Sequence, residues 1–182
     1  MLTTLPKLNK ILEIAESYNG IYEGSEAHHH LVDFYNTLSP LPRGYHLKYS
    51  DSWCAAYVSV VMRRSGILEF PYECGVFELY KKLIKKGCVV QGRFPMPGEI
   101  LFFKSSHVGI VNGWIQNNFT VSTIEGNTSD MCAHRRHNLL HKNILGWASP
   151  YRYNVNEIQK QLDGNVWGDS ETASKLLYIN GY

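Results

Sequence analysis

The feature that most constrains the fold of this 182-residue chain is a change of sequence pattern near residue 95. Before that point, apolar residues recur at helical spacing, which predicts helices at about 7–19, 26–36, 52–66 and 76–86. After it, short apolar runs between turn residues predict strands at 100–103, 107–114, 119–125 and within 143–150. Helices first and strands later within one core indicate an α+β fold, in which N-terminal helices pack on an antiparallel sheet.

Composition places the chain among ordinary globular proteins and argues against several functions. The net charge of +2 and the lack of a dense basic face argue against a nucleic-acid partner. The N-terminus has no apolar core of a signal peptide, and no segment reaches membrane-spanning length. We therefore expect synthesis in the cytoplasm and no membrane insertion. The four cysteines form no C-x-x-C pair, so we expect no disulfide scaffold and no cysteine metal site. We also expect no other metal, no cofactor and a monomer.

Three separate segments carry the residue types of a cysteine acyl-transfer site. Cys54 lies where the run 52–56 begins an apolar helix, and His107 opens a predicted strand. Glu125 and Asn127 follow at the end of the next strand. A thiol nucleophile needs a base, and that base needs a polar group to orient it. We therefore predict an enzyme in which Cys54 is the nucleophile, His107 the base, and Glu125 or Asn127 the orienting group.

The register of the hairpin between the two strands brings the histidine and the polar pair together. With a three-residue loop at 116–118, His107 faces Asn127 and Gly109 faces Glu125, so their side chains share one face. A two-residue loop would turn Glu125 toward the aliphatic core, which would cost several kcal/mol. The longer loop is therefore expected, and Gly109 would leave room for another backbone or for a substrate.

The start of the third helix can supply further parts of such a site. One of the residues 50–52 is expected to cap this helix. The backbone N–H of Cys54 is a natural oxyanion donor, because the first-turn amides of a helix lack helical partners. Tyr49 and Trp53 are candidates for a side-chain donor and for contact with the substrate.

Two histidine-rich stretches are interpreted as surface features. Successive helical positions point about 100° apart, so the three histidines of 28–30 cannot chelate one ion, and we expect a solvated surface. The run 134–137, with His141 and Lys142, forms a basic patch. It is expected on an exposed strand and loop, where it could contact phosphates or acidic peptides.

Taken together, these motifs resemble the CHAP family (cysteine, histidine-dependent amidohydrolases/peptidases), a papain-like group common in phage endolysins and bacterial cell-wall hydrolases. The matching pieces are the segments 52–59, 97–100, 107–111 and 124–127. The resemblance implies a papain-like catalytic domain over residues 1–153 that cleaves peptidoglycan, as an N-acetylmuramoyl-L-alanine amidase or as an endopeptidase. It assigns the nucleophile to Cys54, the base to His107, and the orienting role to Glu125 with Asn127. Some relatives bind calcium through an Asp-x-Asp loop, which the segment 45–51 lacks, so no calcium is expected.

The segment 154–182 resembles the short helical cell-wall-binding repeat of some phage lysozymes. Gly164, Trp167, Gly168 and the final pair 181–182 fit that repeat. The resemblance implies a small helical tail whose Trp167 would contact the wall. The alternative is that Trp167 anchors the tail on the main domain.

Two other functions remain open. The related NlpC/P60 peptidases orient the catalytic histidine with a second histidine, and the nearest later one here is His134. A non-catalytic wall-binding protein could also keep the same fold.

A phage-type lysin would reach the wall after holin-type release or as part of a phage particle.

Overall fold

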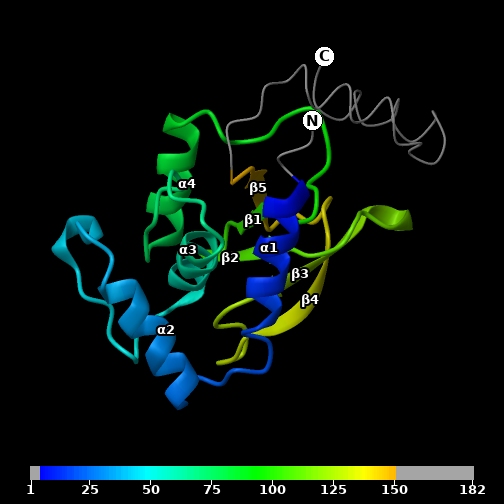
Figure 1. The fold of residues 1–182 in the computed structure, drawn as a ribbon. Helices are drawn as coiled ribbons and strands as arrows, with labels where there is room; N and C mark the ends of the chain where they lie inside the picture. Colours follow the sequence, from blue (N-terminus) through cyan, green and yellow to red (C-terminus); the bar gives the residue numbers. More distant parts are fainter. Residues whose placement is uncertain (1–4, 151–182) are drawn as a thin grey trace.

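A computed structural model describes residues 5–150 of the chain, so the expected tail with Trp167 lies outside the described residues. Within them, four α-helices precede a five-stranded antiparallel sheet (Figure 1), which confirms the predicted α+β class. The elements are α1 (Leu5–Glu16), α2 (Glu26–Asn36), α3 (Cys54–Arg64), α4 (Val76–Lys85), β1 (Ile100–Phe103), β2 (His107–Val111), β3 (Thr120–Glu125), β4 (Ala133–Asn138) and β5 (Ile144–Ala148). None of the described helices is both long and apolar enough to cross a bilayer.

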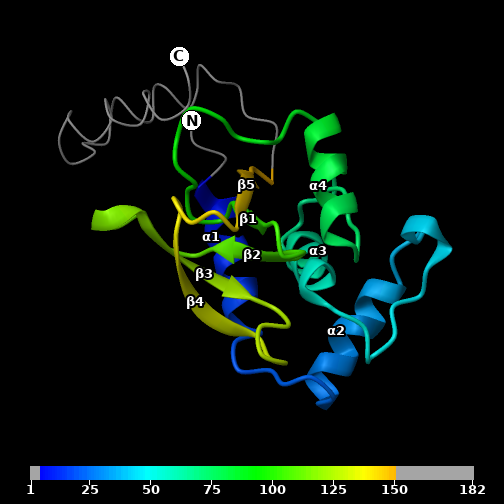
Figure 2. The same ribbon diagram turned by 180° about the vertical axis from the view of Figure 1, so that it is seen from behind.

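Helix α3 is the buried centre of the helical layer. Every residue from Cys54 to Met62 is buried, because the helix contacts α1, α2, α4 and β2. Figure 2, seen from behind, shows the strands in front of α1 and α3. Burial of a large apolar side chain contributes about 1.5–3 kcal/mol. The helix that carries Cys54 is therefore held on all sides.

The sheet has strand order β4-β3-β2-β1-β5 and carries apolar side chains on both faces. Val108, Ile110 and Ile124 belong to the main core, together with residues of α3. The opposite face holds a second, smaller cluster, which consists of Phe94, Leu101, Phe103, Val111, Val121 and Leu139. His107 and Glu125 alternate with the residues that face the main core, so they extend the second face toward one end of the sheet.

The pairing of β2 with β3 has the register expected from the sequence. Ile110 pairs with Ile124, and Val111 pairs with Thr123. A shift by one residue would exchange the two faces of β3 and turn Glu125 into the main core. The predicted register is confirmed.

The tip of this hairpin differs from the expected three-residue loop at 116–118. Regular pairing in β2 ends at Val111, and a 3₁₀ turn at Asn117–Phe119 leads into β3. An isolated bridge between Gln116 and Thr120 closes this turn. A bulged segment on the β2 side absorbs the difference in length, so the register beside His107 does not depend on the tip.

Candidate active site

Three of the predicted site residues meet at one end of the sheet. Cys54 is the first residue of α3, His107 the first of β2 and Glu125 the last of β3. The Nε2 atom of His107 lies 2.7 Å from Oε2 of Glu125. The side chain of Cys54 lies close enough to His107 to raise the pKa of the imidazole, and Nδ1 is the ring nitrogen that the contact with Glu125 leaves unused. A thiol, an imidazole and a carboxylate therefore form one chain of contacts.

His107 is held in its charged form by these two partners. Burial lowers its pKa, but the hydrogen bonds with Cys54 and Glu125 outweigh burial and raise the pKa from 6.5 to about 9. The imidazolium is therefore the favoured form at neutral pH. An imidazolium near a cysteine side chain is the pairing found in thiol nucleophiles, whose reactive form is the thiolate.

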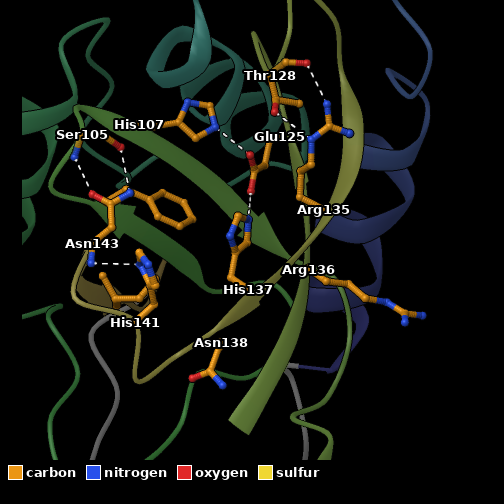
Figure 3. A pocket seen from close by; sticks show the side chains of 12 residues that line it. Ser105, His107, Glu125, Thr128, Arg135, Arg136, His137, Asn138, His141 and Asn143 are labelled. Carbon is orange, nitrogen blue, oxygen red and sulfur yellow. Dashed lines mark hydrogen bonds and ion pairs between the residues drawn. The ribbon is translucent and has the colours of Figure 1, made fainter. Parts of the chain in front are cut away.

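Glu125 is buried at the centre of a hydrogen-bond network (Figure 3). Only 1% of it is exposed. Its Oε1 atom accepts hydrogen bonds from Thr123 Oγ1 at 2.6 Å and from His137 Nε2 at 2.6 Å. Burial raises the pKa of Glu125, but the bonds from His107, His137 and Thr123 together lower it to about 2. The carboxylate of Glu125 is therefore charged at neutral pH.

His137 is the functional candidate that sequence reasoning missed. His134 and Arg136 are exposed, as expected for the basic patch, and Figure 3 shows Arg136 directed away from Glu125. His137 is partly buried instead. It turns inward because β4 pairs with β3 and the residues of β4 alternate between the two faces. The alternation could have indicated this position, but only with the pairing of β3 and β4 already known.

Gly109 provides the space that Glu125 occupies. A Cβ atom at residue 109 would lie 2.6 Å from Cγ of Glu125. The sequence predicted that this space would admit a backbone or a substrate, and the structure corrects that prediction: the carboxylate side chain fills it. Gly126 acts similarly toward α3, since a Cβ there would lie 2.6 Å from Cβ of Tyr57.

Asn127 contacts the start of α3 instead of His107. Its backbone has a positive φ of 55°, so it has left the strand and belongs to a turn. In the orientation that satisfies its amide, the side chain donates to Glu23 Oε2 at 3.3 Å and accepts from the backbone N–H of Trp53 at 3.2 Å. The expectation that Asn127 helps to orient His107 is therefore corrected. Its contacts position Trp53, the residue before Cys54.

The first turn of α3 has no side-chain cap, contrary to the expectation that one of the residues 50–52 would provide it. Asp51 instead accepts hydrogen bonds from the backbone N–H of Lys48 at 2.8 Å and from the hydroxyl of Tyr45 at 2.7 Å. Amides in the first turn lack partners within the helix. The N–H of Cys54 is therefore available to a developing oxyanion.

The two aromatic residues predicted to contact the substrate have different surroundings. Trp53 is fully buried, and its Nε1 donates to Glu23 Oε2 at 3.1 Å, so its predicted substrate contact is corrected to a role in the core. Tyr49 is 43% exposed, and its ring stacks on that of His29 with the ring centroids 3.9 Å apart. Its hydroxyl donates to Asp33 at 2.8 Å, so it is already engaged.

His28 also departs from the expected solvated surface. It is fully buried, its Nδ1 accepts from the backbone N–H of Gly24 at 3.0 Å, and its ring packs 4.9 Å from that of Trp53. Burial lowers its pKa, which favours the neutral ring. No group of three or more His, Cys, Asp or Glu side chains within residues 5–150 is arranged to hold a metal ion.

A cleft of about 480 Å³ adjoins the carboxylate side of His107. Its lining includes Arg135, His137 and His141, while the one acidic residue among the lining side chains, Glu125, is already hydrogen-bonded to three donors. This volume is in the range of small-molecule and peptide sites. The basic lining favours a ligand with a carboxylate.

Comparison with models of known protein families and with curated proteins found no match to this chain. The interpretation of the site therefore depends on its geometry and on the chemistry of its residues.

The charged pair gives a prediction for stability as a function of pH. A depressed carboxylate pKa contributes stability that is present above the usual 4.5 and is lost as the pH falls toward about 2. The raised pKa of His107 contributes stability that is present below 6.5 and is lost as the pH rises through about 9. We expect the free energy of unfolding, measured by urea titration, to fall by on the order of 2–3 kcal/mol across the acid range. Glu125→Gln should remove that acid dependence, and an unchanged slope would contradict the assignment.

Proposed function

We propose that this protein is a CHAP-type cysteine hydrolase that cleaves an amide bond in bacterial peptidoglycan. The observation that carries the proposal is the continuous chain of contacts from Cys54 through His107 to Glu125. The order of these residues, with the cysteine at the start of a buried helix and the histidine at the start of a strand, is also that of a papain-like fold. The papain-like assignment is part of the proposal.

In the proposed reaction, the Cys54 thiolate attacks the carbonyl carbon of the amide. The resulting oxyanion accepts a hydrogen bond from the N–H of Cys54. The proton on His107 Nδ1 passes to the leaving amine as the C–N bond breaks, which leaves a thioester on Cys54. His107 then takes a proton from water as the hydroxide attacks the thioester. The C–S bond breaks, which releases the acid product and restores the Cys54 thiolate beside the protonated His107. Glu125 keeps the imidazole oriented throughout.

The cleft beside His107 supports a peptide as the substrate. It has room for a short length of peptide chain, and Arg135 and His141 in its lining suit the free carboxylates of acidic stem peptides. The bond cleaved could be that of an amidase substrate or that of an endopeptidase substrate. The wall of a bacterium would then be both substrate and site of action.

The NlpC/P60 alternative requires a second histidine that orients the first. A second histidine is present, but its Nε2 contacts Glu125 and not the ring of His107. The group that orients His107 is therefore the carboxylate of Glu125, which favours the CHAP-type proposal. A non-catalytic wall-binding protein would not need an uncapped α3 beside a charged imidazole.

The test is digestion of purified cell walls from several species with the full chain, followed by mass spectrometry of the soluble fragments. New N-terminal alanine would identify the amidase, and new termini within the stem or bridge would identify an endopeptidase. Cys54→Ser protein serves as the blank. Absence of any released fragment with the wild type, or equal release with the blank, would overturn the proposal.

Gly109→Ala is expected to slow wall hydrolysis by about 10- to 100-fold, because the added methyl group displaces Glu125 from His107. The same clash should lower the free energy of unfolding by about 1–3 kcal/mol. Rates are measured as loss of turbidity of wall suspensions. The matched control is Gly113→Ala, whose methyl group would meet the rotatable hydroxyl of Ser122 instead. Equal rates for the two variants would contradict the role of Gly109.

A further inference from the structure

Glu125 has two carboxylate oxygens, and a different histidine binds each of them. Oε2 lies 2.7 Å from Nε2 of His107, and Oε1 lies 2.6 Å from Nε2 of His137. The proposed mechanism uses the first contact only. The second contact comes from a different strand, β4. It therefore links the carboxylate of Glu125 to the side of the cleft that β4 forms (Figure 3).

The surroundings of His137 make its position well defined. Its ring lies 4.6 Å from the ring of Phe103 on β1, which in turn lies 5.6 Å from the ring of His107. About a quarter of the His137 side chain (24%) is exposed, toward the cleft. A carboxylate held at one oxygen alone can rotate about its last bond, whereas one held at both oxygens cannot. Thr123 Oγ1, on the same strand as Glu125, also donates to Oε1 at 2.6 Å. The contacts of His107 with Oε2 and of His137 and Thr123 with Oε1 together fix the plane of the carboxylate, and His137 is the Oε1 donor that comes from the neighbouring strand.

We propose that His137 is a positioning residue of the active site, which holds Oε1 of Glu125 so that Oε2 remains directed at His107. The inference rests on the proposed thiol–imidazole site but does not depend on the identity of the substrate. His137 acts through Glu125, so its loss weakens the support of the imidazolium and thereby of the Cys54 thiolate.

The groups that surround Glu125 determine how the test is read. His107 faces it from β2, and His137 faces it from β4, while Cys132 just before β4 feels its charge. Thr123 on β3 donates to it and does not titrate near neutral pH. On the cleft side, Arg135 donates to Thr128, and His141 accepts from the backbone N–H of Asn143. His107 and His137 are thus the titratable groups in direct contact with the carboxylate.

The test is the pH dependence of Cys54 alkylation by iodoacetamide in the full chain, with the modified cysteine identified by peptide mass spectrometry. His137→Phe keeps a ring against Phe103 but removes the donor. We expect it to move the pH of half-maximal alkylation upward by about half a unit or more, and to slow wall hydrolysis by about tenfold or more. His137→Gln places an amide N–H near the position of Nε2 and should restore the wild-type midpoint.

The matched control is His134→Phe, a neighbouring histidine on β4 that also pairs with a glutamate, Glu16, at 3.1 Å. It should leave the alkylation midpoint unchanged. A purely structural role for His137 would lower the melting temperature of His137→Phe without moving the midpoint, and that result would overturn the inference. So would a midpoint for His137→Gln equal to that of His137→Phe.

A second measurement needs no variant. In wild-type protein with ¹⁵N-labelled histidine, two ring N–H protons should be protected from exchange with water, one from His107 and one from His137. Rapid exchange of the His137 proton would count against the inference. Alkylation and exchange are both measured without substrate, so a wild type that cleaves no wall would overturn the proposed function and leave this test intact.

Discussion

Replacement of Cys54 by serine is expected to lower the rate of wall hydrolysis by roughly 10⁴-fold or more. The hydroxyl is nearly isosteric with the thiol, but an alcohol is a much weaker nucleophile than a thiolate. The side chain is almost fully buried in a helix that is packed on all sides, so the substitution should change the melting temperature very little. The rate is measured by turbidity and by fragment release.

The matched control for this variant is Cys74→Ser. Cys74 is also a free cysteine, and its backbone N–H and its thiol contact Glu73, away from the proposed site. It should retain the wild-type rate. If the two cysteine variants lose activity equally, or if Cys54→Ser remains active, Cys54 is not the nucleophile.

The second large effect is expected for Glu125→Gln, which should slow hydrolysis by about 10³- to 10⁴-fold. The amide cannot accept hydrogen bonds at both ends, so its NH₂ group faces either His107 or His137 as a donor against a donor. Without the carboxylate, the imidazolium loses its charged partner and the pKa of His107 falls. The pH profile of the residual rate, measured alongside the rate itself, should shift accordingly.

Glu73→Gln is the control that distinguishes the loss of the carboxylate at the proposed site from the loss of a buried carboxylate elsewhere. Glu73 is also 1% exposed, and it pairs with Arg43 at 2.9 Å and with Lys82 at 3.0 Å. Its pKa is lowered, because the bonds from Lys82 and the backbone of Cys74 outweigh burial. We expect Glu73→Gln to lower stability but to leave the rate per folded molecule unchanged. An equal loss of rate in both variants would show that Glu125 acts through the fold alone.

Much of the fold could be predicted because the relevant signals are local. The helical spacing of apolar residues located α1 to α4 to within a few residues, and turn residues located β1, β3 and β5. The register of β2 against β3 was predictable for a different reason. A single buried carboxylate, Glu125, makes the alternative register costly, so one residue decides the pairing.

The predictions that were wrong concern residues whose contacts come from distant parts of the sequence. Asn127 was expected beside His107, but the turn that follows β3 directs its side chain to Trp53. His28 looked like a surface residue, yet it is buried against the same tryptophan. His137 was predicted to lie on an exposed basic strand, because nothing in the local sequence reveals which strand lies beside it. In each case the side chain's partner is chosen by packing.

The sequence by itself determined the order of the elements, the place of Cys54 at a helix start and the meeting of His107 with Glu125. Periodicity, turn chemistry and the cost of burying a charge act over short distances along the chain, so they can be read from it. Only the tertiary structure decided that a second histidine binds the carboxylate, that Gly109 makes room for it, and that no side chain caps α3. Those features arise where β1 to β4 and α3 converge, and a contact between distant segments exists only once the whole chain has packed.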